Sequence, residues 1–513
     1  MNKAKRFLSN ALMLSCVSIV MRGIAVSFNA YITKKIGAES MGLFTLVMSV
    51  YGFAVTVALS CVNLAAVRLT SERCALLDGA DRTSWKFAMK HVVRAVVQYS
   101  LIFGTLSAVC LYWASGFLSV YVLKDTRTLL SLKLMAVSLP AVSLSSALSG
   151  YFTGLRKVSK NAVSTMIEQF LKIVITSTAL AVIIPGDVEK ACLAVVGGGV
   201  LAEAGSLIVN MILYFTDSGK PADQIYGTKA LSLNTSFKNA SSISLPAAVG
   251  SYARQGLTTL EHLAIPAGLR KSGLSAKKAL ASYGLMQGIA LPLVMFPYAV
   301  IGSFTSLLIP EMAEKHELRD TKGMLFLTEE VYRYSAIFSM GACGIFANYA
   351  SDLGLLIYDS SEAAVYTLLL GLLVPFMYLD TAVDSLLKGL GEQVYIMKVN
   401  ILDSAGGLLL VMLTIPHMGI MGYILTIWIC ELGNLSASIS KLGKITGAGI
   451  LSAVHFYLRP AIIILVLTVI KQIWMANIPT IPSIFLYAGI YISLNVLVSQ
   501  ARKTKRPAAA SLF

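Results

Sequence analysis

Long apolar runs separated by short polar segments dominate the amino-acid sequence. The runs are about 20 residues long, the length that an α-helix needs to cross a bilayer, whereas barrel strands would alternate over segments of about 10 residues. No connection between the runs is long enough for a separate soluble domain. The pattern therefore predicts an all-α polytopic membrane protein with about 14 transmembrane helices. The predicted spans are residues 11–33, 41–66, 92–114, 129–151, 162–184, 191–215, 241–264, 280–309, 331–357, 364–387, 399–415, 419–440, 459–475 and 483–501.

The composition supports a membrane protein. Hydrophobic residues make up 56% of the 513 residues and charged residues only 13%. Soluble domains carry about 25% charged residues, so a water-soluble fold of this composition would expose a largely apolar surface.

The distribution of the net charge of +16 predicts the orientation of the chain. Lysine and arginine fall mainly between the apolar runs, and most of them lie on one side when the N-terminus is placed in the cytoplasm. This positive-inside pattern predicts a cell-membrane protein with both termini cytoplasmic, and it argues against a nucleic-acid partner. The first run is too long for a signal peptide and lacks a cleavage site, so we expect a retained helix.

An internal repeat divides the predicted helices into two lobes. When the chain is shifted by 235 residues, Pro140 meets Pro375, the dipeptide 154–155 meets 389–390, and Glu168 meets Asp403. Because six helices separate the copies, both have the same orientation in the membrane, and a substrate site is expected between them. We predict an N-terminal lobe of six spans, a C-terminal lobe of six spans, and two additional spans with a basic cytoplasmic tail. Their ranges are 1–240, 241–445 and 446–513.

Two arginines stand out among the charges within the predicted spans. Arg22 and Arg254 each lie near the centre of a helix without an acidic residue three or four positions away. An arginine at the bilayer centre costs about 2.5–3.5 kcal/mol on insertion scales, so a binding role is favoured. Two guanidinium groups would suit a pyrophosphate, which they bind bidentately. Pairing with Glu203, with Glu261 or with a helix-end carbonyl remains the structural alternative.

The acidic residues within the spans suggest ion coupling. Glu168, Asp380 and Asp403 are candidates for binding H⁺ or Na⁺, and Lys172 is a candidate cavity-lining residue. The spacing of Glu168 and Lys172 also suits a local ion pair. Asp380 shares a helical face with Asp384 but is predicted to lie deeper, where it would line a cavity.

Other chemistry is weakly indicated. The seven cysteines form no CxxC pair, and the five histidines are scattered, so we expect neither a metal site nor a cofactor. The loops contain no HExxH motif and no acidic pair arranged for Mg²⁺, so an enzyme is not expected. The prolines of the spans and the run Gly197–Gly198–Gly199 suit either helix bending or close packing.

Three short motifs resemble a known group of transporters. They are Gly37–Phe44, the segment from Tyr151 to Asn161, and the segment from Leu291 to Glu311 with its Phe296-Pro297. Together these resemble the stage V sporulation protein B branch of the multidrug/oligosaccharidyl-lipid/polysaccharide exporter superfamily, and the likeness covers nearly the whole chain.

The resemblance implies a two-lobed flippase without ATP hydrolysis that acts on undecaprenyl-pyrophosphate-linked sugars, with a role in peptidoglycan, polysaccharide or spore-cortex assembly. Lipid II flippases of this superfamily carry arginines in a central cavity. Arg22 matches the first of them, whereas Phe28 and Pro292 stand at two other arginine positions, so the resemblance implies a less basic cavity here. The expected partners are a lipid-linked oligosaccharide, membrane lipids and H⁺ or Na⁺, and we expect a monomer. The alternative is a cation-coupled multidrug exporter of the same fold.

Overall fold

The computed structural model describes residues 3–76, 82–182, 187–217, 237–358, 360–474 and 478–504. Within these ranges all regular secondary structure is helical, which confirms the predicted fold class. The chain divides into two compact units, Met1–Gly284 and Leu285–Phe513. The end of the predicted basic tail, after Thr504, lies outside the described residues.

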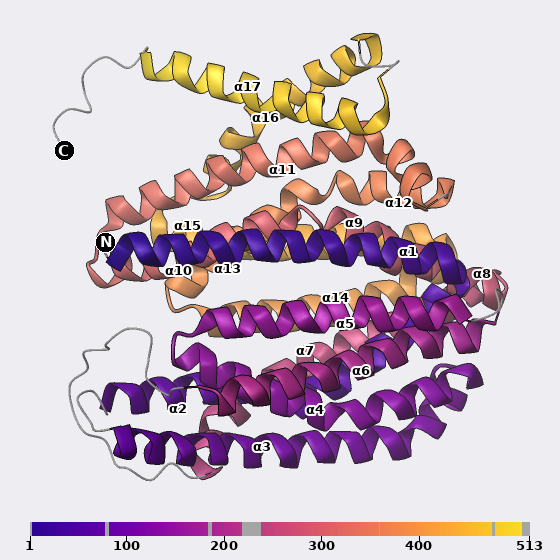
Figure 1. Cartoon of the computed structure of the whole chain (residues 1–513). Helices are drawn as coiled ribbons and strands as arrows, with labels where there is room; N and C mark the ends of the chain where they lie inside the picture. The colour runs from indigo at the N-terminus through magenta and orange to yellow at the C-terminus, as the bar shows by residue number, and fades with distance from the viewer. Residues whose placement is uncertain are drawn as a thin grey trace. The chain divides into compact units, whose positions relative to one another are not determined.

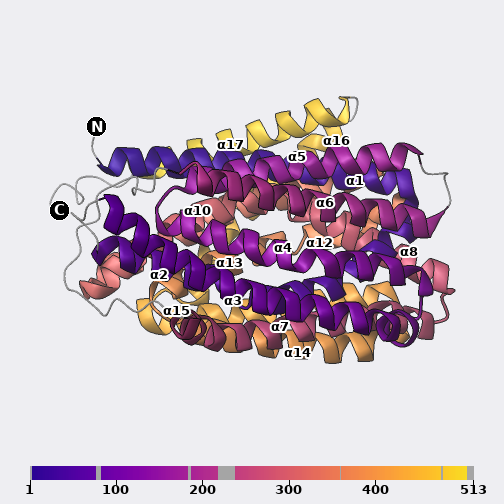
Figure 2. The ribbon, with the colours of Figure 1, turned by 60° about the horizontal axis from the view of Figure 1, so that its bottom comes forward.

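The first unit is built around α4, which packs against α2, α3 and α6 (Figure 2). Helix α7 also packs in this unit, against α1, α2 and α3. This grouping differs from the predicted lobe ranges 1–240, 241–445 and 446–513, which follow the sequence repeat and stay predictions. The helices of the unit are α1 (Lys3–Leu59), α2 (Val62–Leu76), α3 (Arg82–Phe117), the π-helix η1 (Leu118–Val122), the 3₁₀-helix η2 (Thr126–Thr128), α4 (Leu129–Gly154), α5 (Val158–Val182), α6 (Val188–Phe215), α7 (Phe237–Lys271) and α8 (Ala276–Leu285).

The second unit is organised around α11 and α13. Helix α11 packs against α12, α13, α16 and α17, and α13 packs against α10 and α15 (Figure 1). The helices are the π-helix η3 (Met286–Ala290), α9 (Leu291–Val294), α10 (Tyr298–Glu317), α11 (Thr321–Tyr358), α12 (Ser361–Gly371), α13 (Val374–Gly389), α14 (Gln393–Met418), α15 (Ile420–Thr446), α16 (Ile450–Trp474) and α17 (Thr480–Thr504).

Each of the fourteen predicted spans falls on helical residues of the described ranges, but fewer continuous helices are long and apolar enough to cross a membrane. Nine qualify among the described residues, or ten if the bent pair α12–α13 is one span. One of the nine, Val20–Cys74, is 55 residues long and holds two predicted spans. Helices α7, α10 and α11 cover three further predicted spans and are not among the nine. The number fourteen therefore stays a prediction.

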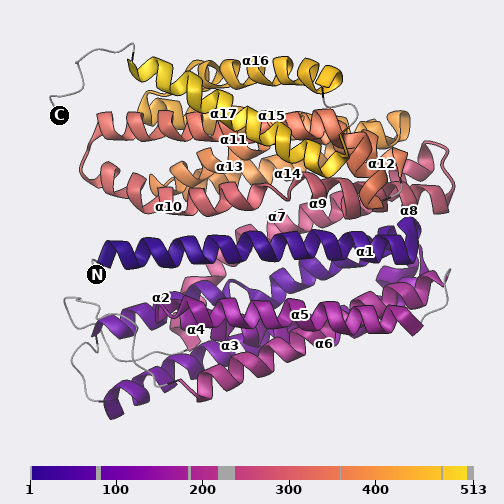
Figure 3. The same cartoon turned by 45° about the horizontal axis from the view of Figure 1, so that its top comes forward.

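Gly37 divides α1 into two limbs. Its φ of 82° and ψ of 164° interrupt the helix, and such a positive φ favours glycine because it has no Cβ. The second limb turns back from this point (Figure 3). A single long helix by hydrogen bonding thus supplies the first two predicted spans.

The second limb of α1 ends at an unusual break. Ser60 and Cys61 both have positive φ, 40° and 56°, although neither is glycine. The carbonyl oxygens that the break frees are bonded by neighbouring helices: Tyr99 Oη donates to Ser60 O at 3.0 Å, and Ser244 Oγ donates to Cys61 O at 3.0 Å. A break inside a predicted span is tolerated because these side chains satisfy the backbone.

The internal repeat has a structural counterpart in the way α4 and α13 end. Lys157 N donates to Phe152 O at 2.9 Å, and Glu392 N, 235 residues later, donates to Leu387 O at 3.0 Å. The residue before each donor has a positive φ, 58° at Arg156 and 79° at Gly391. Both helices therefore end in the same Schellman-type turn, which supports a real duplication.

The two matched prolines behave differently. Pro140 lies inside the continuous helix α4, whereas Pro375 lies in the first turn of α13, after a bend of 49° between α12 and α13. Proline is tolerated at a helix start because its missing N–H would have no intrahelical acceptor there. Of the two, only Pro375 accompanies a broken span.

The glycine run of α6 serves packing rather than bending, since α6 continues through it. A Cβ on Gly198 would overlap Thr176 Oγ1 of α5, whereas a Cβ on Gly199 would have nothing within 4 Å. We expect Gly198→Ala to lower the free energy of unfolding by about 1–2 kcal/mol, because the helices must separate or Thr176 must rotate. Gly199→Ala should be neutral or stabilise by up to about 1 kcal/mol through helix propensity. Thermal unfolding of the purified variants measures both, and equal effects at the two positions would contradict this packing.

The predicted additional helices α16 and α17 pack against α11 through a polar network. Lys471 Nζ donates to Asn348 O at 3.0 Å, and Tyr349 Oη lies 2.7 Å from Ser483 Oγ. Figure 3 shows this pair of helices, in yellow, beside α11. The pair is thus an integral part of the second unit.

Candidate functional site

Arg22 and Arg254 both belong to the first unit. Arg22 lies on the first limb of α1 and is partly exposed, and Arg254 lies on α7 with an exposed side chain. Arg254 forms no ion pair among the described residues, so its predicted structural alternatives, Glu203 and Glu261, are not its partners. An exposed guanidinium at this position remains accessible to a ligand.

The helix geometry places the two arginines at a similar depth. Arg22 precedes Gly37 by 15 residues, and Gly52 follows it by 15 residues, so both lie about 22 Å from the turn at 1.5 Å per residue. Arg254 reaches this level because α7 packs against the second limb beside Gly52, where Thr259 Oγ1 donates to Ser49 O at 3.0 Å. The two cations therefore lie at comparable depth within one unit.

A polar cavity of about 240 Å³ lies among α1, α4, α5 and α6. Most of its lining side chains carry a hydroxyl, amide or carboxylate group, an unusual density for a membrane helix bundle. The residues that line it are Leu59, Val142, Ser145, Ser146, Ser149, Asn161, Ser164, Thr165, Glu168, Glu203, Ser206 and Asn210. Glu168 thus lines a cavity, as one of the two interpretations from sequence had it.

The local ion pair between Glu168 and Lys172 is not formed. Neither side chain has an ion-pair partner among the described residues, although their i, i+4 spacing permits one. The interpretation of this spacing as a salt bridge was therefore wrong. The Glu168 carboxylate faces the cavity without a basic group in direct contact.

Glu203 is held by residues that the sequence did not single out. Tyr51 Oη donates to its two carboxylate oxygens at 2.9 and 3.1 Å, and also lies 2.7 Å from Ser138 Oγ. Tyr51 belongs to the second limb of α1, Ser138 to α4 and Glu203 to α6. The only sequence signal for this triad was the presence of isolated polar residues in apolar runs.

In the second unit, acidic side chains gather on α13, α14 and α15. The charges of Asp384, Glu431 and Asp403 all act on Asp380, and Ser438 Oγ donates to Asp384 Oδ1 at 3.3 Å. Asp380 Oδ1 is buried and accepts no hydrogen bond from the described residues. The structure thus brings the candidates Asp380 and Asp403 together. No group of three or more acidic, histidine or cysteine side chains among the described residues is arranged to hold a metal ion.

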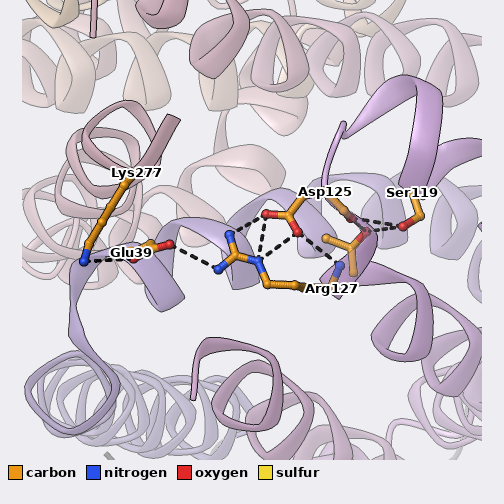
Figure 4. Close-up of polar contacts among 6 residues, drawn as sticks. Glu39, Ser119, Asp125, Arg127 and Lys277 are labelled. Atoms are coloured by element: carbon orange, nitrogen blue, oxygen red, sulfur yellow. Dashed lines mark hydrogen bonds and ion pairs between the residues drawn. The ribbon is translucent and has the colours of Figure 1, made fainter. Parts of the chain in front are cut away.

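An ion cluster surrounds Glu39, directly after the turn at Gly37. Arg127 Nη1 lies 3.2 Å from Glu39 Oε1 and its Nη2 lies 2.6 Å from Asp125 Oδ2 (Figure 4). Lys277 of α8 approaches Glu39 Oε2 at 3.8 Å. Glu39 therefore ties the turn of α1 to η2 and to α8, a role that the sequence motif around it did not reveal.

Comparisons with known proteins agree with this architecture. A family model described as polysaccharide biosynthesis protein matches residues 7–316. Stage V sporulation protein B of Bacillus subtilis (strain 168) is 24% identical over 423 residues, which cover 82% of this chain and 80% of that protein. Sporulation protein YkvU of the same organism is 19% identical over 71% of this chain and 78% of that protein.

Two groups of solved structures share the fold. The lipid II flippase MurJ in an inward closed conformation superposes with a TM-score of 0.67 and 13% identity, covering 98% of this chain and 100% of that chain. The multidrug transporter DinF-BH of the MATE family, in complex with R6G, gives a TM-score of 0.61 and 13% identity, with 85% and 95% covered.

Proposed function

Because the chain belongs to the polysaccharide biosynthesis protein family, we propose that it is a flippase that moves an undecaprenyl-pyrophosphate-linked sugar outward across the cell membrane. The sugar would be a peptidoglycan precursor or a polysaccharide repeat unit for cell-wall or spore-cortex assembly. The similarity to stage V sporulation protein B supports the second part of the proposal. The proposed orientation has both termini in the cytoplasm, and the mechanism is alternating access without ATP hydrolysis.

Arg22 and Arg254 carry the chemical part of the proposal. Their comparable depth within one unit and the exposed side chain of Arg254 support a shared anionic ligand. A pyrophosphate offers several oxygens to the planar donors of two guanidinium groups, and such charge-assisted bonds are stronger than neutral ones. The lipid tail would lie in the bilayer beside α16 and α17.

A reconstituted system tests this proposal. The purified protein is placed in liposomes, and translocation of lipid II is compared with that of another undecaprenyl-linked glycan. We expect Arg22→Ala and Arg254→Ala each to lower the rate about ten-fold or more, because a charged hydrogen-bond donor contributes about 1.5–3 kcal/mol.

Arg68→Ala is the matched control, since Arg68 lies on α2 in an exposed pair with Glu72 at 2.8 Å. Unchanged flipping in both span variants would refute the pyrophosphate role. The alternative, a cation-coupled multidrug exporter, is favoured by the buried unbonded Oδ1 of Asp380. Transport of a cationic dye that is lost in Asp380→Asn would support that alternative instead.

A further inference from the structure

The polar cavity of the first unit has more hydrogen-bond acceptors than the protein satisfies. Asn161 Nδ2 donates to the backbone carbonyl of Ser149 at 3.0 Å, so this amide cannot be flipped without losing the bond. Its Oδ1 consequently points away from that donor role and accepts no hydrogen bond from the described residues, although it is buried.

Asn210 presents the same feature from the neighbouring helix. Its side chain is only 2% exposed and lines the cavity. Its Nδ2 donates to Ser145 Oγ at 2.7 Å, while its Oδ1 accepts no hydrogen bond from the described residues. A buried unsatisfied polar atom costs about 1–3 kcal/mol, so two of them on one cavity indicate a ligand that donates hydrogen bonds or carries positive charge.

The charges around the cavity specify the ligand further. Glu168 and Glu203 both line it, and Glu203 already accepts its hydrogen bonds from Tyr51. Lys172 lies close enough for its charge to act on Glu203 but forms no ion pair with Glu168. Two carboxylates and one ammonium leave one uncompensated negative charge when all three are ionised.

We propose that this cavity binds one monovalent cation, Na⁺ or hydronium, with Glu168 as its charged ligand and the side-chain oxygens of Asn161 and Asn210 as neutral ligands. The lining offers carboxylate, amide and hydroxyl oxygens, the donor set that hard cations select. The single residual charge matches a monovalent ion rather than a divalent one. A sugar is a poorer fit, because the lining contains no aromatic ring on which a pyranose could stack.

The site is placed to influence the second limb of α1. Glu203 is bonded to Tyr51 of that limb, and Leu59, which ends it, lines the cavity. The limb then breaks at the strained residues Ser60 and Cys61. A bound cation would draw the oxygens of α5 and α6 together beside this break. That this movement couples to transport rests on the proposed flippase function, whereas cation binding itself does not.

Direct binding to the purified full-length protein tests the site. For Na⁺, saturable binding of radioactive ²²Na⁺ is measured by scintillation proximity. For hydronium, infrared difference spectra between acidic and alkaline buffers report the carboxylic C=O band of a protonated glutamate. Glu168→Gln, which nearly preserves shape, should weaken Na⁺ binding about ten-fold or more, or abolish that infrared band; Asn210→Ala should weaken Na⁺ binding by a similar factor.

Glu189→Gln is the matched control, because Glu189 is exposed in the first turn of α6 and does not line the cavity. A second control, Asp380→Asn, separates this site from the acidic cluster of the second unit. Size-exclusion profiles and unfolding temperatures show whether each variant is folded. Binding that survives in Glu168→Gln, or the absence of both signals in the wild type, would mean that the cavity holds water only and would overturn the proposal. Loss of binding with intact flipping would leave the proposed function standing and refute the coupling alone.

Discussion

Replacing Gly42 with alanine is expected to lower the free energy of unfolding of the first unit by about 3 kcal/mol or more. The second limb of α1 and helix α8 cross here with their backbones in contact. A Cβ on Gly42 would overlap the carbonyl oxygen of Leu280, and a Cβ on Gly284 would overlap the carbonyl oxygen of Ala38. Backbone atoms cannot rotate away as a side chain can, so the helices must separate and lose their packing. Thermal unfolding followed by size-exclusion chromatography measures the effect.

Gly52→Ala is the matched control for this crossing. Gly52 lies on the same limb, but a Cβ there would meet only the Gln255 side-chain amide, at 3.3 Å. A flexible amide can move by a few tenths of an ångström, so we expect a change below about 1 kcal/mol. Similar losses at Gly42 and Gly52 would contradict the close crossing.

The crossing also gives a physical reason for the motif Gly37–Phe44 noted in the sequence. Gly37 supplies the positive φ of the turn, Glu39 bonds Arg127 at 3.2 Å, and Gly42 allows the approach of α8. The sequence placed these residues between two spans, and the structure assigns each a separate task. Glycine and charge were visible as letters, but their partners lie more than 80 residues away.

The helices themselves could be predicted because apolar runs of sufficient length must be helical in a bilayer. The break at Ser60 and Cys61 could not be predicted, since neither residue is glycine or proline and its carbonyls are bonded by Tyr99 and Ser244 from distant helices. The two matched prolines show the same limit. Identical letters at Pro140 and Pro375 lie in a continuous and a bent element because the surrounding packing decides.

The candidate site was only partly predictable for a related reason. Sequence spacing suggested a Glu168–Lys172 ion pair, but side-chain direction is set by neighbouring helices, and Glu168 faces the cavity instead. The neutral ligands Asn161 and Asn210 received no attention because isolated amides in apolar runs are common. Charge is conspicuous in a hydrophobic sequence, whereas the hydrogen-bond acceptors that complete a cavity are not.

The repeat preserves an ion pair with reversed polarity. In the first unit, Lys157 Nζ lies 2.7 Å from Asp217 Oδ1; in the second, Glu392, which corresponds to Lys157, lies 2.8 Å from Lys441 Nζ. Each pair joins the turn before α5 or α14 to the end region of the next helix. The two pairs differ in burial: the side chains are 13% and 6% exposed in the first pair but 31% and 30% exposed in the second. Burial rather than sequence position should therefore decide how much each contributes.

Asp217→Ala is expected to cost about 3 kcal/mol of unfolding free energy, because it leaves Lys157 and Lys160, which lies 2.9 Å from Asp217 Oδ1, without their partner in a largely buried position. Glu392→Ala, the matched control in the exposed pair, should cost at most about 1 kcal/mol. Chemical or thermal unfolding of the two variants at neutral pH measures the difference. Equal costs would show that burial does not distinguish the two pairs.

The pH dependence provides an independent check of the same cluster. Burial tends to raise the pKa of Asp217, but the hydrogen bonds from Lys157 and Lys160 outweigh it and hold the pKa below its ordinary value of 3.8. A carboxylate with a lowered folded-state pKa stabilises the fold above its unfolded-state pKa and loses that contribution as the pH falls through the folded-state pKa. The stability difference between the wild type and Asp217→Ala should thus be constant around neutral pH and shrink only in acid below about pH 4. A difference that disappeared already on moderate acidification, while both proteins remained folded, would mean that Asp217 is not held ionised by the two lysines.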